Sequence, residues 1–213
     1  MAHSILGLMR DLVKALYLTA TQVRARLFYV EREFPSSISL SAKLDVIPRT
    51  PDHQRHRLVL KKHSLIEKQC VVNTWHGDVI IEECAAVGIG SIIVGPVTMG
   101  RDSGCAQNCF ITGQSHRYDD VSKNFREQGF DIRAVVIEEN VYIGSNSVIL
   151  PGVTIGKNSI IGAGAVVTKN IPPFSVAVGN PARTIKRYDE EKKQWVRVLP
   201  CQVKRLEDQH YHI

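Results

Sequence analysis

The most regular feature of the sequence is a hydrophobic residue that recurs every six positions. Written in sixes from Ile137, the chain reads IEENVY, IGSNSV, ILPGVT, IGKNSI, IGAGAV and VTKNIP, and every unit begins with Ile or Val. The same rule holds over the six units that start at Ile81, where Met99 and Cys105 take the aliphatic position. An α-helix would repeat every 3.6 residues and a strand every two, so neither element explains the spacing.

A triangular coil explains a period of six, because each unit supplies one short strand and one turn. Three units close a coil, and successive coils stack as parallel strands about 4.8 Å apart. The first residue of each unit then points inward, and the fifth is small because the chain turns there. Gly and Asn at the third and fourth places tolerate the positive φ that such turns need. The repeats therefore predict an all-β core, a parallel β-helix over residues 64–180.

The phase of the repeat breaks once, between Ile111 and Ile137, which are 26 residues apart and so not a multiple of six. A polar loop is therefore inserted at about residues 117–134. Loops held on a rigid scaffold often carry function. The chain divides into an N-terminal helical and irregular segment (1–63), the β-helix (64–180) and a C-terminal helix and tail (181–213).

Residues 4–33 are predicted to form a helix that ends before Pro35. Its apolar residues fall on one face at helical spacing: Ile5, Leu8, Met9, Leu12 and Leu16. We expect this stripe to pack on the rest of the protein. The alternative is peripheral contact with a membrane surface, since Arg10, Lys14, Arg24 and Arg26 add positive charge.

The segment after the repeats, DEEKKQWVRVL (189–199), is expected to form a second helix. A helix there would cover the last coil, whose unpaired strand edges would otherwise invite aggregation.

Composition excludes several classes of protein. A formal charge of +6 is mild, and no basic aromatic motif accompanies it, so we expect no nucleic-acid partner. The five cysteines form neither a disulfide framework nor a zinc site and are read as small buried residues. Charges interrupt the N-terminal apolar residues, and no apolar run is long enough for a membrane span. We therefore expect a cytoplasmic protein.

The run VYIGSNSVILPGVTIGKNSIIGAGAVVTKNIPPFSVAVGNPARTIKRY resembles the hexapeptide-repeat acyltransferases. The likeness is greatest to bacterial sugar and polysaccharide O-acetyltransferases and to the galactoside, maltose and xenobiotic acetyltransferases, and it covers about residues 81–188. It implies a left-handed β-helix and acetyl-CoA as the co-substrate. It also implies a homotrimer whose active sites lie between subunits.

The resemblance assigns one catalytic residue. In these families a His at the start of the inserted loop is the general base, and ITGQSHRYDD places His116 in that role. An imidazole exchanges protons near neutral pH. It can take the proton of a sugar hydroxyl while that oxygen attacks the thioester directly. The expected reaction is O-acetylation of a sugar or surface-polysaccharide precursor.

The coenzyme residues follow by register from the galactoside-type enzymes. Ser145, Ala163, Thr168 and Lys169 match positions that meet the pantetheine arm, and Arg183 and Lys186 match those near the adenosine phosphates. Tyr142 takes the place of a family Trp in the wall beside the thioester.

Other functions stay open at this point. The same base and coenzyme would serve N-acetylation of an amino sugar or acetylation of a xenobiotic. A non-enzymatic β-helix scaffold would show the same repeats. Zinc carbonic anhydrases with this fold need a pair of His residues five apart on one coil, and residues 64–180 contain no such pair.

Overall fold

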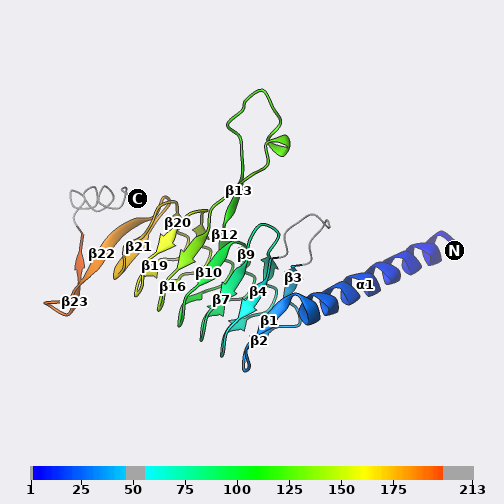
Figure 1. Cartoon of the computed structure of the whole chain (residues 1–213), viewed down its shortest axis with the longest axis horizontal. Helices are drawn as coiled ribbons and strands as arrows, with labels where there is room; N and C mark the ends of the chain where they lie inside the picture. The colour runs from blue at the N-terminus through cyan, green and yellow to red at the C-terminus, as the bar shows by residue number, and fades with distance from the viewer. Residues whose placement is uncertain (1, 47–55, 199–213) are drawn as a thin grey trace.

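The computed structural model describes residues 2–46 and 56–198, which form a triangular parallel β-helix with additions at both ends (Figure 1). Each coil contributes one strand to each of three sheets. Sheet A contains β1 (Val30–Arg32), β4 (Leu58–Leu60), β7 (Val79–Ile81), β10 (Val97–Met99), β15 (Val135–Ile137) and β18 (Thr154–Ile155). Sheet C contains β3 (Lys43–Asp45), β6 (Val71–Asn73), β9 (Ile92–Val94), β12 (Phe110–Thr112), β17 (Val148–Ile149) and β20 (Val166–Val167).

Sheet B is longer than the other two because it continues past the last coil. Its coil strands are β2 (Ser37–Ile38), β5 (Leu65–Ile66), β8 (Ala86–Val87), β11 (Gly104–Cys105), β16 (Tyr142–Ile143) and β19 (Ile160–Ile161). Beyond them follow β21 (Ser175–Val178), β22 (Arg183–Asp189) and β23 (Gln194–Arg197). We name the turns between the sheets the AB, BC and CA corners.

The hydrophobic period of six builds the core as predicted. The first residues of successive units stack in register on sheet A, all fully buried: Leu60, Ile81, Met99, Ile137 and Ile155. The fifth residues at the AB corner are also buried and mostly small, as Ala85, Ser103 and Ser159 illustrate. The prism interior is therefore a column of aliphatic side chains that excludes water.

The fourth residue of most units has the positive φ that the sequence predicts for the corners. Asn140, Asn146 and Asn158 adopt φ values of 53°, 59° and 56°, and Gly164 has φ 71°. Asn tolerates this left-handed conformation better than other side chains, and Gly adopts it without a steric cost.

The β-helix begins much earlier than residue 64. Strands β1, β2 and β3 pair in parallel with β4, β5 and β6, so the first coil starts at Val30. The prediction of an irregular segment there was wrong. Arg32, Ile38 and Leu44 keep the six-residue spacing, but Arg32 is polar. The interval from Val30 to its partner Leu58 is 28 residues, which is not a multiple of six and hides the coil in the sequence. Residues 47–55, within that interval, lie outside the described part of the chain.

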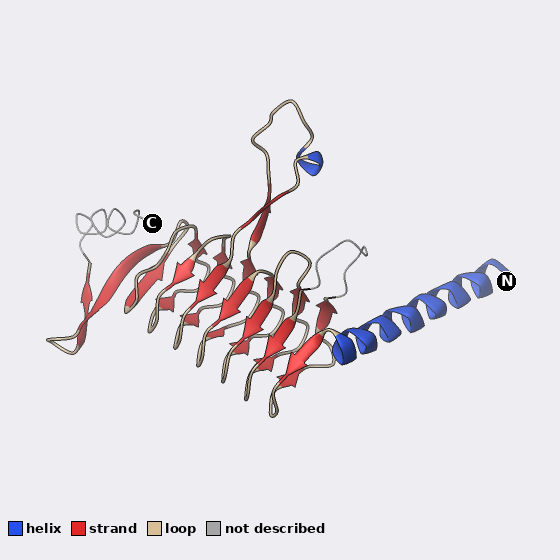
Figure 2. Ribbon diagram, in the orientation of Figure 1, coloured by secondary structure: helices blue, strands red, loops and turns tan. Residues whose placement is uncertain are grey.

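The predicted N-terminal helix exists as α1 (Ala2–Phe28), but the described members of its apolar stripe, Met9, Leu12 and Leu16, are exposed and do not pack on the rest of the protein. Only its last turns touch the prism, where Ala25 is fully buried and the Gln22 side chain hydrogen-bonds both the amide and the carbonyl of Leu44. The rest of α1 projects beyond the first coil (Figure 2). No helix of the described chain is long and apolar enough to cross a membrane.

The helix predicted from DEEKKQWVRVL is also wrong over the described residues 189–198, which lie in a β-hairpin. Strand β22 pairs antiparallel with β21 and with β23, extending sheet B. The Asp189 carboxylate accepts hydrogen bonds from the amides of Glu191 and Lys192 and so forms the turn. The free edge of sheet B pairs with β22, and β22 in turn pairs with β23, so this tertiary pairing overrides the local helix propensity of the charged run. Residues 199–213 are outside the described chain.

Candidate active site at the CA corner

The inserted loop projects from the CA corner of the coil that contains β12 (Figure 1). Its two stems are β13 (Gln114–His116) and β14 (Phe130–Ile132), which pair antiparallel with His116 opposite Phe130. The loop is thus a rigid-based hairpin at the predicted place, with a single 3-10 turn, η1 (Phe125–Glu127), near its tip.

Hydrogen bonds within the hairpin hold its outer part. The Gln128 side chain donates to the carbonyls of Asp120 and Lys123 and accepts from the Asp120 amide. The hydroxyl of Ser122 and then the ammonium of Lys123 lower the pKa of the Asp120 carboxyl. Asp120 therefore stabilises the loop through hydrogen bonds and charge interactions with other residues of the same loop.

His116 stands at the base of the hairpin with its imidazole exposed. The ring lies between two phenylalanines: Phe130 is 4.4 Å away in a tilted arrangement, and Phe125 is 5.1 Å away in an edge arrangement. Both phenylalanines belong to the inserted loop. Aromatic contacts of this kind restrict the orientation of a ring without using its nitrogens.

A second histidine joins this cluster, and sequence reasoning did not find it. His76 lies at the CA corner between β6 and β7, and its ring centroid is 4.5 Å from that of Phe130. Phe130 therefore contacts both His116 and His76. The two histidines are 40 residues apart, and only the fold of the hairpin onto an earlier coil joins them.

The residues matched to the pantetheine arm fall at two different corners. Thr168 and Lys169 follow β20 at the CA corner, on the column that carries His116. Ser145 and Ala163 follow β16 and β19 at the BC corner, where the Gly164 amide donates to the Ser145 carbonyl at 2.8 Å. Sheet C separates the two groups within one chain.

The BC corner carries small side chains and is exposed to solvent. A Cβ placed on Gly164 would meet nothing within 4 Å, and Ala163 is exposed. The Ser145 hydroxyl donates to Oε1 of Gln107 on the preceding coil, at 3.1 Å. Small side chains and free backbone here fit the close approach of a thin, flexible chain such as pantetheine.

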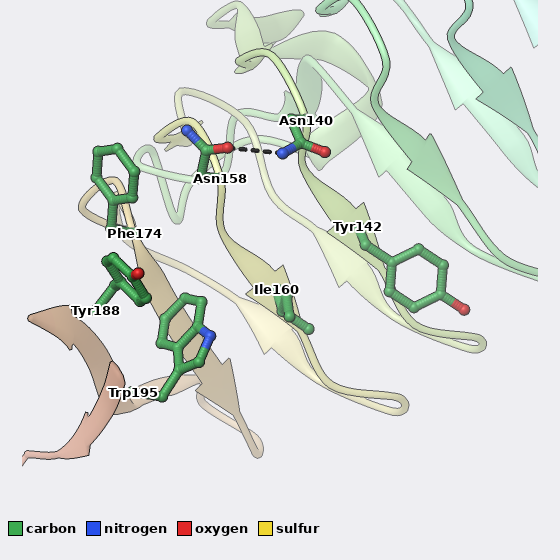
Figure 3. A pocket seen from close by; sticks show the side chains of 7 residues that line it. All are labelled: Asn140, Tyr142, Asn158, Ile160, Phe174, Tyr188 and Trp195. Carbon is green, nitrogen blue, oxygen red and sulfur yellow. Dashed lines mark hydrogen bonds between the residues drawn. The ribbon is translucent and has the colours of Figure 1, made fainter. Parts of the chain in front are cut away.

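Tyr142 lies elsewhere, on the outer surface of sheet B. It lines a pocket of about 380 Å³ together with Asn140, Asn158, Ile160, Phe174, Tyr188 and Trp195 (Figure 3). Nδ2 of Asn140 donates to Oδ1 of Asn158 at 2.6 Å along one side of this pocket. Within one chain, Tyr142 and His116 belong to different sides of the prism.

Arg183 and Lys186 both lie on β22, a strand in place of the expected helix. Arg183 is half-buried and donates to the carbonyl of Ala182 at 3.0 Å, whereas Lys186 is exposed. The register of β22 on β21 shifts between Val176 and Ala177, which interrupts the alternation of buried and exposed residues. Among the described residues, no group of three or more His, Cys, Asp or Glu side chains could hold a metal ion.

Comparison with known proteins gives one family match: the bacterial transferase hexapeptide family (six repeats) matches residues 134–169. The Escherichia coli K12 protein named as a lipopolysaccharide biosynthesis O-acetyl transferase, WbbJ, is 39% identical over 106 residues, 46% of this chain and 54% of that protein. A 2,3,4,5-tetrahydropyridine-2,6-dicarboxylate N-acetyltransferase of Halalkalibacterium halodurans is 57% identical over 61 residues, 29% of this chain and 25% of that protein. The chain thus spans about half the length of the first relative and a quarter of the second.

Solved structures share the fold. AntD, an N-acyltransferase from Bacillus cereus, was crystallised with dTDP-4-amino-4,6-dideoxyglucose and coenzyme A and superposes with a TM-score of 0.64 at 17% identity. The match covers 81% of this chain and 91% of AntD. PerB from Caulobacter crescentus, in complex with CoA and GDP-perosamine, gives a TM-score of 0.52 at 21% identity, covering 78% of this chain and 62% of PerB. At these identities the likeness concerns the fold.

Proposed function

Because this chain belongs to the hexapeptide-repeat transferases with a left-handed β-helix, we propose that it is an acetyl-CoA-dependent O-acetyltransferase. Its acceptor is a hydroxyl group of a sugar or of a surface-polysaccharide precursor. The observation that carries the proposal is the position of His116: an exposed imidazole at the base of a rigid hairpin, in the same corner column as Thr168 and Lys169.

His116 acts as the general base. Its imidazole takes the hydroxyl proton as the acceptor oxygen attacks the thioester carbonyl carbon, and it then gives the proton to the departing thiolate. The products are the acetyl ester and free coenzyme A. A positioned base of this kind contributes roughly 10²–10⁴-fold in rate. Phe125 and Phe130 hold the ring in place.

The two ends of the CA corner suggest where each substrate lies. Thr168 and Lys169 are on a coil beyond His116, and His76 is on a coil before it. If the coenzyme lies against Thr168 and Lys169, the acceptor approaches His116 from the opposite direction, past His76. Arg183 and Lys186 then meet the coenzyme phosphates, with Lys acting as a point charge.

The active enzyme is proposed to be a homotrimer, since the BC and CA corners of one chain are separated by sheet C. A site that uses both groups takes one corner from each of two subunits. Apolar side chains on the outer surface of sheet C support such contacts, because they form a ladder in register: Val71, Ile92, Phe110, Val148 and Val166. Phe110 is 38% exposed in the isolated chain.

N-acylation of an amino sugar is the second candidate. AntD and PerB have this fold and were crystallised with an amino-sugar nucleotide or GDP-perosamine, and the curated relatives include N-acetyltransferases. The same base would take a proton from the ammonium group of the acceptor, and the neutral amine formed would then attack the thioester carbonyl carbon. The two candidate functions differ in the acceptor group, which is a hydroxyl in the first and an amine in the second.

A thiol-release assay with acetyl-CoA tests the proposal against matched hydroxyl and amino sugars. We expect His116→Ala to lower kcat/KM by roughly 10²–10⁴-fold, the contribution of a general base, while calorimetry shows unchanged acetyl-CoA binding. The control is His63→Asn at the AB corner, where a φ of 59° suits Asn and activity should stay within about twofold. Full activity of His116→Ala, or no acetyl-CoA binding by the wild type, would overturn the assignment.

A further inference from the structure

Helix α1 exposes far more apolar surface than a water-facing helix of an isolated chain should. Met9, Leu12 and Leu16 are 59–63% exposed, although each is a large hydrophobic side chain. The prism covers only the last turns of the helix, near Ala25. Contiguous exposed apolar surface on a soluble protein marks a place where another surface docks.

The spacing of these side chains identifies the kind of surface that fits. Met9, Leu12, Leu16, Thr19 and Val23 are separated by three, four, three and four residues, the a/d pattern of a coiled coil. Leu12, Leu16 and Val23 are exposed along this line.

Neighbouring positions of the helix agree with a helix bundle. Three of the four residues that would flank such a seam are apolar or small, namely Val13, Ala15 and Ala20, and the fourth is uncharged Gln22. The charged residues between Met9 and Val23, which are Arg10, Asp11 and Lys14, all fall at the remaining heptad positions. A membrane-surface helix would instead carry a polar face rich in Lys and Arg, but here exposed Leu18 interrupts that face.

The attachment of α1 sets its direction. The Gln22 amide pairs with the backbone of Leu44 on β3, and the Arg26 guanidinium donates to the carbonyls of Ser39, Leu40 and Ala42. The helix is thereby fixed over the end of the first coil and runs off the prism along its long dimension (Figure 1). Cyclic symmetry would bring the α1 helices of all subunits to the same end, pointing the same way.

We propose that α1 associates with the α1 helices of other copies of this chain in a parallel coiled coil whose seam is Met9, Leu12, Leu16, Thr19 and Val23. The inference rests on the proposed homotrimer, in which sheet C also contributes to the contacts. In this arrangement the coiled coil fixes the end of the assembly nearest the first coil. The exposed apolar residues of α1 become its core.

Cysteine cross-linking of the full chain tests the seam. Leu16→Cys and, as matched control, Leu18→Cys are made in a background in which Cys84 and Cys201 are replaced by Ser. Mild oxidation is expected to yield covalent dimers from Leu16→Cys, because seam residues of a parallel coiled coil face their equivalents. Leu18→Cys, 52% exposed at an outer position, should give several-fold less. Equal yields at both positions, or no dimer from Leu16→Cys in a trimeric protein, would refute the proposal.

Charge substitution tests its contribution to assembly. In sedimentation experiments, Leu12→Asp with Leu16→Asp should dissociate at protein concentrations at least tenfold higher than the wild type, whereas Leu18→Asp should match the wild type. Flotation with vesicles of anionic phospholipid is measured in parallel. Recruitment of the wild type but not of the double variant, with unchanged assembly, would assign the surface to a membrane instead. Because thiol release is assayed separately, loss of the helix contact is distinguishable from failure of the catalytic proposal.

Discussion

Replacing Gly144 by Ala should destabilise the prism next to the proposed coenzyme groove. Gly144 begins the BC corner after β16, and its φ is not in the left-handed region, so only space limits the substitution. An added Cβ would lie 2.6 Å from the backbone N of Ala163 and 2.9 Å from its Cα, closer than real Cβ contacts. Backbone cannot swing aside, so the two coils must separate there.

The separation would strain two backbone hydrogen bonds of 2.8 Å, from the Gly144 amide to Ile161 and from the Gly164 amide to Ser145. Overpacking of this kind costs about 1–3 kcal/mol. For a chain of this size the melting temperature should fall by about 2–12 °C, at roughly 2–4 °C per kcal/mol. The KM for acetyl-CoA should rise, because Ser145 and Ala163 move with the corner.

The matched control is Gly104→Ala on the outer surface of β11, where the nearest atom to a new Cβ is the carbonyl oxygen of Ala86 at 3.5 Å. That substitution should leave the protein as stable as the wild type, or slightly more stable, because Ala restricts the unfolded chain. Differential scanning calorimetry of both variants decides the matter. Equal melting temperatures for Gly144→Ala and Gly104→Ala would show that the coils are not as tightly stacked as the structure has them.

Three further outcomes are expected. Ile155→Ala, in the fully buried column of sheet A, should lower the free energy of unfolding by about 2–5 kcal/mol in urea titrations, and a loss under 1 kcal/mol would contradict a dry, close-packed interior. In the native protein an alkylating reagent should modify exposed Cys84 and spare buried Cys105. Partial desolvation and then the Asp102 and Glu83 carboxylates raise the pKa of Cys84, so its labelling rate should still increase above about pH 9. A labelling rate that reaches its plateau below that pH would disprove the shift. Phe130→Ala should lower kcat several-fold with an unchanged KM for acetyl-CoA, since it releases the His116 and His76 rings but touches none of the proposed coenzyme residues. Equal effects on both constants would point to a general loss of structure.

The sequence predicts the regular part of this fold because its physical cause is local and repeated. An aliphatic residue every six positions, a small fifth residue and a left-handed fourth residue each act within one unit. The same logic locates the inserted hairpin, since an interval of 26 residues between Ile111 and Ile137 cannot be accommodated by coils alone.

The ends of the chain were predicted less well because non-local pairing decides them. The first coil keeps the six-residue spacing at Arg32, Ile38 and Leu44, but its first member is polar and the next coil follows after 28 residues instead of 18, so the stacking of β1 on β4 rather than periodicity defines it. Strand β23 lies in a charged run that predicts a helix, but β22, which extends the edge of sheet B, supplies a strand partner for it. In both places tertiary hydrogen bonding outweighs the local pattern.

The candidate site was predictable only where it coincides with the break in the repeat. The break locates the inserted loop, and the family resemblance assigns the role of base to His116 at its start. His76 does not, because an isolated His on an early coil carries no signal until the hairpin folds back and inserts Phe130 beside it. Tyr142 could be matched by register, but register alone does not say which side of the prism a residue occupies.

A uniform prism cannot by itself gather different side chains at one point, since every corner repeats the same small residues from coil to coil. Chemistry therefore requires departures from the repeat or contacts between copies. Here the inserted hairpin is the departure, and the contacts between copies are those of the proposed homotrimer: the hairpin brings His116 and Phe130 out from the CA corner, and Ser145 and Ala163 remain one sheet away at the BC corner. If the proposed site uses both corners, the spacing that makes the fold predictable is also what obliges two chains to share each active site.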